Sequence, residues 1–264
     1  CFINEYVFSI ADGEAEAAHG LRMALEQKLS AGEPYPPLWP VAVGAYCPLH
    51  ILDNAQALLD RPASPSITAL LTQQVAEPAE EKRIAATIPA VTEIGGEVSR
   101  AVRQQYEENP YPRWTKLGPP AQPVALFSLP AQQLGDALIA GCGTGLSTVE
   151  FARHARSARI LAVDLSLSSL SYAKRMAHRV GLTNVEFAQA DIMKLGALGR
   201  QFDFIDASGV LHHLADPWEG WRILLSLLRP GGAMQVGLYS ELGRRNIVAA
   251  RALIAERGYR PIAD

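Results

Sequence analysis

The chain has 264 residues, of which 48% are hydrophobic and 19% are charged, a balance that suits a globular protein with a sizeable buried core. The formal net charge of −3 argues against a nucleic-acid partner, because proteins that neutralise phosphates usually carry a basic excess. Cys1, Cys47 and Cys142 lie too far apart for a zinc motif or a disulfide framework, and no apolar run reaches the roughly 18 residues of a membrane helix. We therefore expect a cytoplasmic protein that uses no metal and binds neither nucleic acid nor membrane.

Helical spacing dominates residues 1–105. Ala18, Leu21, Leu25 and Leu29 recur at steps of three and four and predict a helix over residues 14–30. By itself the pattern of this region indicates a small all-helical region with no chemistry of its own. Proline-rich segments at 33–40 and 61–66 interrupt the helical pattern. We expect one further helix between them, over 50–59, and three after them: from an N-cap at Ser66 to Gln74, over 78–88 and over 91–106.

The segment YEENPYPRW, residues 106–114, contains two prolines and three aromatic rings and is not expected to form a regular helix. It begins a stretch, residues 106–122, that either links two domains or lies over a pocket as a lid. The aromatic density favours contact with a ligand, because solvated linkers rarely need rings. The candidates for a lid or an acceptor pocket are Tyr106, Tyr111, Arg113 and Trp114.

From Leu134 onward, short apolar segments alternate with helical patterns. This alternation predicts right-handed βαβ crossovers and an α/β fold with a doubly wound, mostly parallel sheet, which we place in a domain of residues 123–264. Ligands of such sheets bind beyond the carboxyl ends of the strands, where the strand order reverses. The expected strands are 137–140, 159–163, 185–189, 202–207 and 233–239, with helices ending near Ala155 and Val180 and a helix over 217–228.

A glycine-rich turn follows the first expected strand, in ALIAGCGTGLSTVEFA at residues 137–152. Gly141, Gly143 and Gly145 allow backbone angles that other residues resist, and they let a ligand approach the backbone closely. The N-terminus of the helix that follows favours polar or anionic ligand groups. A glycine turn can also be purely structural, so its position relative to other polar residues decides what it means.

Two acidic residues end the next two expected strands. Asp164 follows the glycines by about 20 residues, a spacing at which a carboxylate suits the hydroxyls of a ribose. Asp191 ends the third strand. Alone, Asp164 can cap the following helix and Asp191 can be a turn residue. Consecutive strands that bring a glycine turn and two acids to one crevice instead indicate a site for an adenosine-containing ligand.

The glycine spacing discriminates between such ligands. Dinucleotide folds use GxGxxG, whereas this turn reads GxGxG, and Leu146 occupies the position of the third glycine. At these residues the sequence resembles the class I S-adenosylmethionine-dependent methyltransferases, which implies a Rossmann-like fold, S-adenosyl-L-methionine as cofactor and S-adenosyl-L-homocysteine as product. In that family the turn lies under the methionine part, the acid ending the second strand binds the ribose, and the acid ending the third contacts the adenine amine. The resemblance implies these cofactor-binding residues: Gly141, Cys142, Gly143, Thr144, Gly145, Asp164, Leu165, Asp191, Ile192, Ser208 and Gly209.

Other segments extend the resemblance or depart from it. Residues 202–217 look like the family's fourth strand and its loop, and residues 227–240 look like its Arg-Pro-Gly-Gly turn into the fifth strand. Ile139 stands where the family often has an acid, and we expect the sixth and seventh strands to be missing before Asp264. The helical region, YEENPYPRW and the opening CFINEYVF resemble the region after tetratricopeptide repeats in bacterial proteins. That implies a fragment of a longer protein whose upstream repeats recruit a partner or a peptide substrate.

A histidine pair at the mouth of the fourth strand supplies the candidate base. His212 or His213 could take a proton near neutral pH, although such a pair can also serve in packing. The methyl acceptor would be an O or N nucleophile, and the sequence leaves open whether it belongs to a small molecule or to a protein side chain. Two other interpretations stay open: a non-catalytic scaffold or regulator that acts through helical contacts, and a nicotinamide-dependent oxidoreductase, against which the glycine spacing argues.

Overall fold

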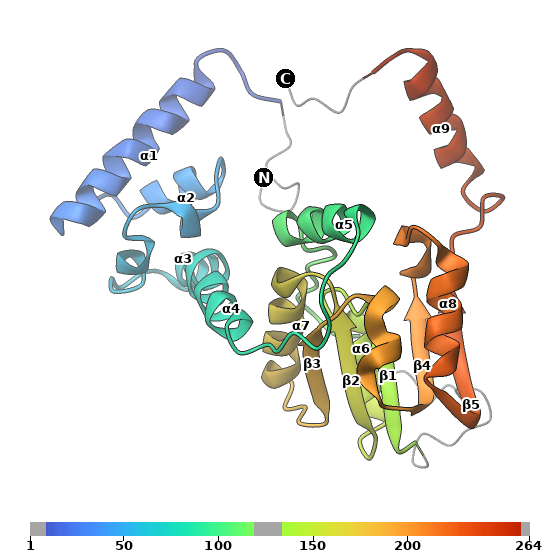
Figure 1. Cartoon of the computed structure of the whole chain (residues 1–264). Coiled ribbons are helices and arrows are strands. Elements are labelled where there is room, and N and C mark those ends of the chain that lie inside the picture. The colour runs from blue at the N-terminus through green and yellow to red at the C-terminus, as the bar shows by residue number, and fades with distance from the viewer. Residues whose placement is uncertain (1–8, 119–133, 260–264) are drawn as a thin grey trace. The chain divides into compact units, whose positions relative to one another are not determined.

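The computed structural model describes residues 9–118 and 134–259, and it divides the chain into two compact units, Cys1–Ala86 and Thr87–Asp264 (Figure 1). The division falls upstream of the boundary that the sequence suggests near residue 105, because the helix before that boundary packs within the second unit.

The first unit is all-helical, as its leucine spacing predicts. Its elements are α1 (Glu14–Ala31), α2 (Trp39–Gly44), 3₁₀ turns at Leu49–Ile51 and Ala55–Leu58, α3 (Pro65–Leu71), a π-helical turn (Thr72–Ala76) and α4 (Glu77–Ala85). Leu25 and Leu49 belong to its buried cluster, and the buried Gln74 amide accepts a hydrogen bond from the Leu49 N–H at 3.1 Å. The expected helix over 50–59 is two 3₁₀ turns, because Asn54 adopts a positive φ of 58° between them. Helix α3 begins after Ser64, two residues earlier than expected.

Helix α5 (Glu97–Glu108) belongs to the second unit and contacts helix α7 (Leu167–Arg179). The expected helix over 91–106 begins only at Glu97, because the Val91 N–H donates to the Gln189 carbonyl at 2.9 Å and so adds to the sheet edge. The helix continues through Tyr106 to Glu108, where the sequence had predicted irregular backbone. It ends before Pro110 because the residue that precedes a proline disfavours helical angles.

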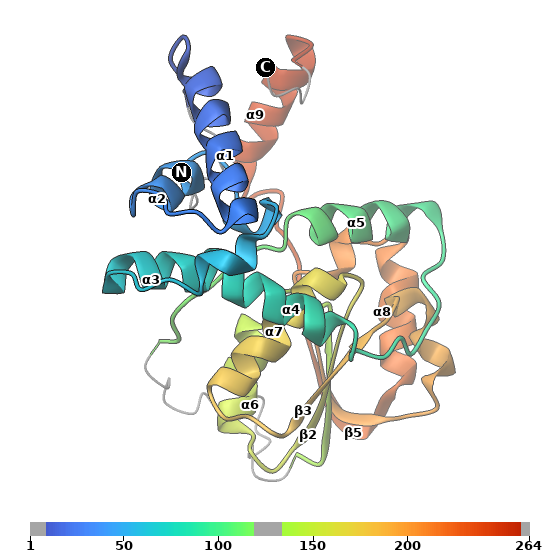
Figure 2. The same cartoon turned by 90° about the vertical axis from the view of Figure 1, so that its left-hand side faces the viewer.

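The second unit contains a five-stranded parallel sheet in the order β3-β2-β1-β4-β5, which confirms the predicted doubly wound fold. Figure 2 shows α6 and α7 on one face and α8 on the other. None of the described helices is long and apolar enough to cross a membrane. The remaining elements are β1 (Asp136–Ala140), α6 (Leu146–His154), β2 (Arg159–Asp164), β3 (Val185–Gln189), a 3₁₀ segment (Ile192–Leu198), β4 (Phe202–Ser208), a 3₁₀ turn (Leu211–His213), α8 (Pro217–Ser226), β5 (Leu228–Gly237) and α9 (Arg245–Glu256).

The strand bounds differ from expectation mainly in β5, which begins at Leu228 and not at 233. The Arg-Pro-Gly-Gly turn is therefore part of the strand, and a register shift between Phe202 and Phe204 accommodates it. The central strand β1 is buried along its whole length, so Ile139 packs into the core of the sheet. The sheet thereby holds the turn after β1 on a rigid base, at the edge that α5 crosses (Figures 1 and 2).

The last glycine of the turn has a packing role that a substitution can test. Gly145 has a φ of 79°, and a Cβ there would lie 2.5 Å from the Cβ of Ala173 on α7. Gly145→Ala should lower the free energy of unfolding by about 1–3 kcal/mol beyond the backbone cost alone, because the helix has to shift. The control is Gly181→Ala, at a φ of 72° with no heavy atom within 4 Å of the added Cβ. Equal urea midpoints for the two variants would contradict this packing.

Candidate functional site

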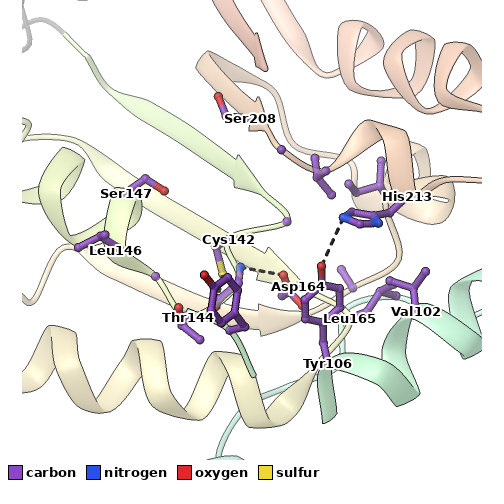
Figure 3. Close-up of a pocket in the computed structure, with 18 of the residues that line it drawn as sticks. Val102, Tyr106, Cys142, Thr144, Leu146, Ser147, Asp164, Leu165, Ser208 and His213 are labelled. Carbon is purple, nitrogen blue, oxygen red and sulfur yellow. Dashed lines mark hydrogen bonds between the residues drawn. The ribbon is translucent and has the colours of Figure 1, made fainter. Parts of the chain in front are cut away.

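A pocket of about 420 Å³ opens at the carboxyl ends of β1 to β4 (Figure 3). Its lining comes from the loop after β1, from the residues that end β2, β3 and β4, and from α5. The strand order reverses between β1 and β4, so the pocket lies at the topological switch point of the sheet.

The glycine turn forms the floor of this pocket. Gly141 and Gly143 have φ values of 72° and 52°. A Cβ at Gly141 would lie 2.3 Å from a methyl group of Val210, whereas a Cβ at Gly143 would meet no heavy atom within 4 Å. Gly141 is therefore required by packing, and Gly143 leaves open space into which a ligand can approach the backbone.

Asp164 connects the end of β2 to this turn. Its carboxylate accepts hydrogen bonds from the Gly143 N–H at 2.8 Å and from the Ser166 N–H at 2.9 Å. Burial raises the pKa of Asp164 above its ordinary value, and these two hydrogen bonds oppose that rise. Each carboxylate oxygen has more than one acceptor position, so the group can still accept hydrogen bonds from a ligand.

Asp191 holds the corresponding place after β3 and is 1% exposed. It caps the 3₁₀ segment that follows by accepting from the Met193 N–H at 3.0 Å, and it also accepts from the Gly95 N–H at 3.3 Å. Asp191 therefore serves as a turn residue, as the sequence allows, and it also lines the pocket.

The segment after α5 crosses the glycine turn and is fixed to it. The Trp114 indole donates to the Thr144 carbonyl at 2.8 Å, and the Thr144 hydroxyl donates to the Pro112 carbonyl at 2.5 Å. The Tyr172 hydroxyl donates to the Trp114 carbonyl. Trp114 is 8% exposed and lies outside the pocket lining, whereas Tyr111 is 70% exposed and lines the pocket. Trp114 therefore supports the turn from outside the pocket.

Arg113 also lies outside the pocket lining. Its guanidinium lies 4.7 Å from the ring centroid of Tyr172, a cation–π arrangement that turns it toward α7. Of the four lid candidates, the structure therefore brings Tyr106 and Tyr111 to the pocket and directs Trp114 and Arg113 elsewhere.

Glu107 fixes α5 to the N-terminus of α7. Its carboxylate accepts from the Leu167 N–H at 3.0 Å and from the Ser168 N–H at 2.8 Å, two amides that have no partner within their own helix. The neighbouring Tyr106 carbonyl accepts from the Ser166 hydroxyl at 3.0 Å. This cap holds Tyr106 at the pocket.

Replacement of Glu107 tests the cap through its pH dependence. Burial acts to raise the pKa of Glu107, but hydrogen bonds from Ser168 and Leu167 and the charge of Arg103 outweigh it and lower the pKa below 4.5. A carboxylate whose pKa is lowered by folding stabilises above its unfolded-state pKa, and this stabilisation is lost as the pH falls through its folded-state pKa. Glu107→Gln should therefore reduce the unfolding free energy by about 1–3 kcal/mol at pH 7.

The difference in unfolding free energy between the parent and Glu107→Gln should shrink below pH 4.5, as measured by urea titrations at several pH values. A difference that stayed constant into strongly acidic solution would show that the charge of Glu107 does not stabilise the cap.

The two histidines differ in position. His213 lines the pocket, and its Nε2 lies 3.3 Å from the Tyr106 hydroxyl, the contact drawn in Figure 3. His212 lies outside the lining, where its ring centroid is 4.3 Å from those of His213 and Tyr239, and neither of its ring nitrogens has a hydrogen-bond partner among the described residues. Burial lowers the pKa of both histidines. The geometry therefore favours His213 over His212 as a base.

The charged side chains among the described residues that line the pocket have one sign. Glu150, Asp164 and Asp191 line it, and the part of the chain that the structure describes contributes no lysine or arginine to the lining. In the same described part, no three His, Cys, Asp or Glu side chains gather in a way that could hold a metal ion. The pocket thus suits a ligand that carries positive charge.

All eleven residues that the sequence resemblance implies for cofactor binding line this pocket. Sequence reasoning missed Glu107, which reads as one of several acids in an amphipathic helix, and Tyr239, which follows β5. It also missed Val102 and Leu214, whose apolar side chains gave no signal apart from helical spacing. The missed lining residues are Ser99, Val102, Pro112, Leu146, Ser147, Glu150, Ala190, Val210, Leu214 and Tyr239.

Part of this chain is similar to known methyltransferases. Residues 137–232 match the family model for a methyltransferase domain. An uncharacterized protein of Synechococcus sp. is 36% identical over 60% of this chain and 41% of its own length. A ubiquinone biosynthesis O-methyltransferase of Cereibacter sphaeroides is 32% identical over 43% of this chain and 44% of its own. PKMT2 from Rickettsia typhi, solved in complex with AdoHcy, is 25% identical with a TM-score of 0.43 over 48% of this chain and 25% of that one.

The chain therefore spans less than half the length of these relatives. Its parallel sheet with flanking helices, preceded by a helical region, has the architecture of a Rossmann-like methyltransferase fold.

Proposed function

We propose that this protein binds S-adenosylmethionine in the pocket at the carboxyl ends of β1 to β4 and transfers its methyl group to an O or N nucleophile. The observation that carries the proposal is the pocket itself, in which a positive-φ glycine turn meets carboxylates and no lysine or arginine among the described lining residues. S-Adenosylmethionine has a sulfonium, an ammonium and a single carboxylate, so its net charge is positive and complements this lining. A pyrophosphate-containing dinucleotide would instead place negative charges beside Asp164 and Glu150.

In this proposal, each part of the cofactor has a place. The open space over Gly143 takes the methionine part, where the N-terminus of α6 offers backbone N–H groups to the carboxylate. Asp164 accepts from the ribose hydroxyls, and Asp191 with Ile192 contacts the adenine. Ile139 is buried in the sheet and cannot bind the ammonium group, so Glu150, which lines the pocket from α6, is the carboxylate that we assign to it.

The chemistry asks little of the protein beyond alignment. The sulfonium of the bound cofactor supplies an activated methyl group for in-line displacement. The chain orients the acceptor. Where the nucleophile must lose a proton, His213 accepts it, because burial lowers the pKa of His213 and so favours the neutral imidazole form. The acceptor belongs either to a small molecule or to a protein side chain.

Calorimetric titration of the whole chain with S-adenosylhomocysteine, with NAD as the control ligand, tests the cofactor assignment. Binding of S-adenosylhomocysteine in the micromolar range and none of NAD is expected. Binding of NAD alone, or of neither ligand, would overturn the proposal. Transfer of a labelled methyl group into any fraction of a cell extract then separates an enzyme from a scaffold that binds the cofactor without using it.

A further inference from the structure

We propose that the methyl acceptor is an uncharged aromatic molecule with a phenolic hydroxyl, and that Tyr106 and His213 together remove the hydroxyl proton. The inference rests on the proposed function and adds the acceptor class and a catalytic pair. It is carried by the acceptor side of the pocket, by which we mean the lining contributed by α5, by the 3₁₀ turn after β4 and by the residue after β5, and which differs in composition from the glycine turn and the carboxylates.

The acceptor side of the pocket is apolar and aromatic. Val102 and Tyr106 of α5 face it, together with Leu214 after the 3₁₀ turn and Tyr239 after β5. Its titratable members are His213 and the two tyrosines, and the described lining residues of this group include no carboxylate, lysine or arginine. Aromatic rings pack on one another edge to face or offset, so Tyr106 and Tyr239 offer surfaces to a ring, and the Arg244 guanidinium covers one face of Tyr239 at 3.9 Å from the ring centroid.

A partner for the acceptor proton lies on the same side. The Tyr106 hydroxyl is 3.3 Å from His213 Nε2, and the two rings meet edge to face with centroids 5.8 Å apart. The backbone of Tyr106 is fixed to α7, because its carbonyl accepts a hydrogen bond from the Ser166 hydroxyl and the adjacent Glu107 caps α7. His213 is held by the ring of His212, which in turn contacts Tyr239. Both members of the pair are therefore positioned by packing, without a ligand.

The proton balance follows from this geometry. With Nδ1 protonated, His213 Nε2 accepts from the Tyr106 hydroxyl, whose oxygen keeps lone pairs toward the pocket. As the acceptor oxygen forms its bond to the methyl carbon and the carbon–sulfur bond breaks, the acceptor proton passes to the Tyr106 oxygen. The Tyr106 proton passes to Nε2. The products are a methyl ether, a neutral thioether and an imidazolium, which returns its proton to water.

The strength of the base selects the acceptor. Burial lowers the pKa of His213, so the ring is neutral at pH 7, and it is a weak base. A phenol, with a pKa of about 10, gives up its proton to such a base during methyl transfer far more readily than an aliphatic alcohol. An aliphatic amine would be protonated at pH 7, and Val102, Leu214 and Tyr239 offer its ammonium group no carboxylate. The titratable groups around the pair are His212, Tyr239 and Arg244, and Asp164 on the other side of Tyr106.

Matched acceptors test the class. With the full chain and labelled S-adenosylmethionine, 2-naphthol should be methylated at least about tenfold faster than 2-(aminomethyl)naphthalene, decahydro-2-naphthol or 2-naphthoate. With S-adenosylhomocysteine bound, 2-naphthol should also bind about tenfold more tightly than decahydro-2-naphthol and shift the His213 ring resonances. Equal or faster transfer to the amine or the alcohol would overturn the proposal. The proposal would also be overturned if the protein bound S-adenosylhomocysteine but neither methylated nor bound 2-naphthol. Failure to bind S-adenosylhomocysteine would instead overturn the cofactor assignment.

Tyr106→Phe tests the pair. It should lower kcat by about 100-fold with KM changed less than about threefold, leave S-adenosylhomocysteine binding intact, and raise the pKa of His213 measured by NMR, because a donor to the neutral ring is lost. The loss in kcat should become smaller for naphthols of lower pKa, which need less help to lose the proton. The control is Tyr259→Phe, an exposed residue outside the pocket lining. An unchanged kcat, or a loss that is independent of acceptor pKa, would assign Tyr106 a packing role only.

Discussion

Gly143→Asp should weaken the binding of S-adenosylhomocysteine by more than about 100-fold, or about 2.7 kcal/mol, while the protein stays folded. The backbone of Gly143 has a φ of 52°, which aspartate adopts more readily than most residues. The added Cβ meets no heavy atom within 4 Å, so the side chain fits without disturbing the sheet. Because Gly143 lines the pocket, that side chain fills the space assigned to the methionine part and lies close to Asp164.

Two controls separate the causes of this loss. Gly143→Asn has the same shape without the charge, so an equal loss would show that the effect is steric. Gly181→Asp places the same side chain at a φ of 72° with open space around its Cβ, outside the pocket lining. The free energy of unfolding of all three variants, measured by thermal unfolding, should stay within about 1 kcal/mol of that of the parent. Unaltered binding by Gly143→Asp would mean that the ligand does not lie over the turn.

The glycine turn and the two acids could be predicted from the sequence because their meaning depends on local backbone and on strand order. Gly141, Gly143 and Gly145 all have positive φ values, as a tight strand-to-helix turn requires. The carboxyl ends of parallel strands meet at one edge of a sheet, so residues that end consecutive strands come together whatever lies between them. That rule alone places Asp164 and Asp191 in one pocket.

The part of the site that α5 contributes could not be predicted in the same way. Glu107 caps a helix that begins 60 residues later, and nothing in the spacing of its own helix indicates that partner. The sequence predicts a helix that ends at Tyr106 and irregular backbone from there on, whereas helix α5 continues to Glu108, and Tyr106 lines the pocket. Long-range contacts of this kind are set by tertiary packing and leave no periodic signal.

Neighbouring residues with similar chemistry were also not separable by sequence. His212 and His213 both fit a base at the mouth of β4, yet only one of them lines the described pocket, because adjacent residues in a 3₁₀ turn point in different directions. The same holds for Tyr111 and Trp114, of which one is exposed at the pocket and the other is buried against Thr144. Composition identifies such a group of candidates, and the backbone decides among them.

Asp164→Asn should weaken S-adenosylhomocysteine binding by about 1–3 kcal/mol, or roughly 5–150-fold, because an amide replaces a carboxylate that accepts from a hydroxyl pair. The affinity of the parent should also fall as the pH drops through the pKa of Asp164. Burial raises this pKa in the free protein, and a ligand that donates hydrogen bonds to the carboxylate lowers it again, so binding favours the ionised form. Calorimetry as a function of pH should show this dependence in the parent and not in Asp164→Asn.

Asp164 also accepts from the backbone of Gly143 and Ser166, so a weaker variant could reflect a disturbed turn and not a lost contact with the ribose. A ligand change separates the two explanations. For an analogue of S-adenosylhomocysteine without the 2′ and 3′ hydroxyls, the parent and Asp164→Asn should bind equally if the carboxylate acts on the ribose. If the variant loses the same factor with both ligands, then Asp164 shapes the turn and the ribose lies elsewhere. Such a double comparison isolates the pairwise interaction because each change removes the same contact from a different side.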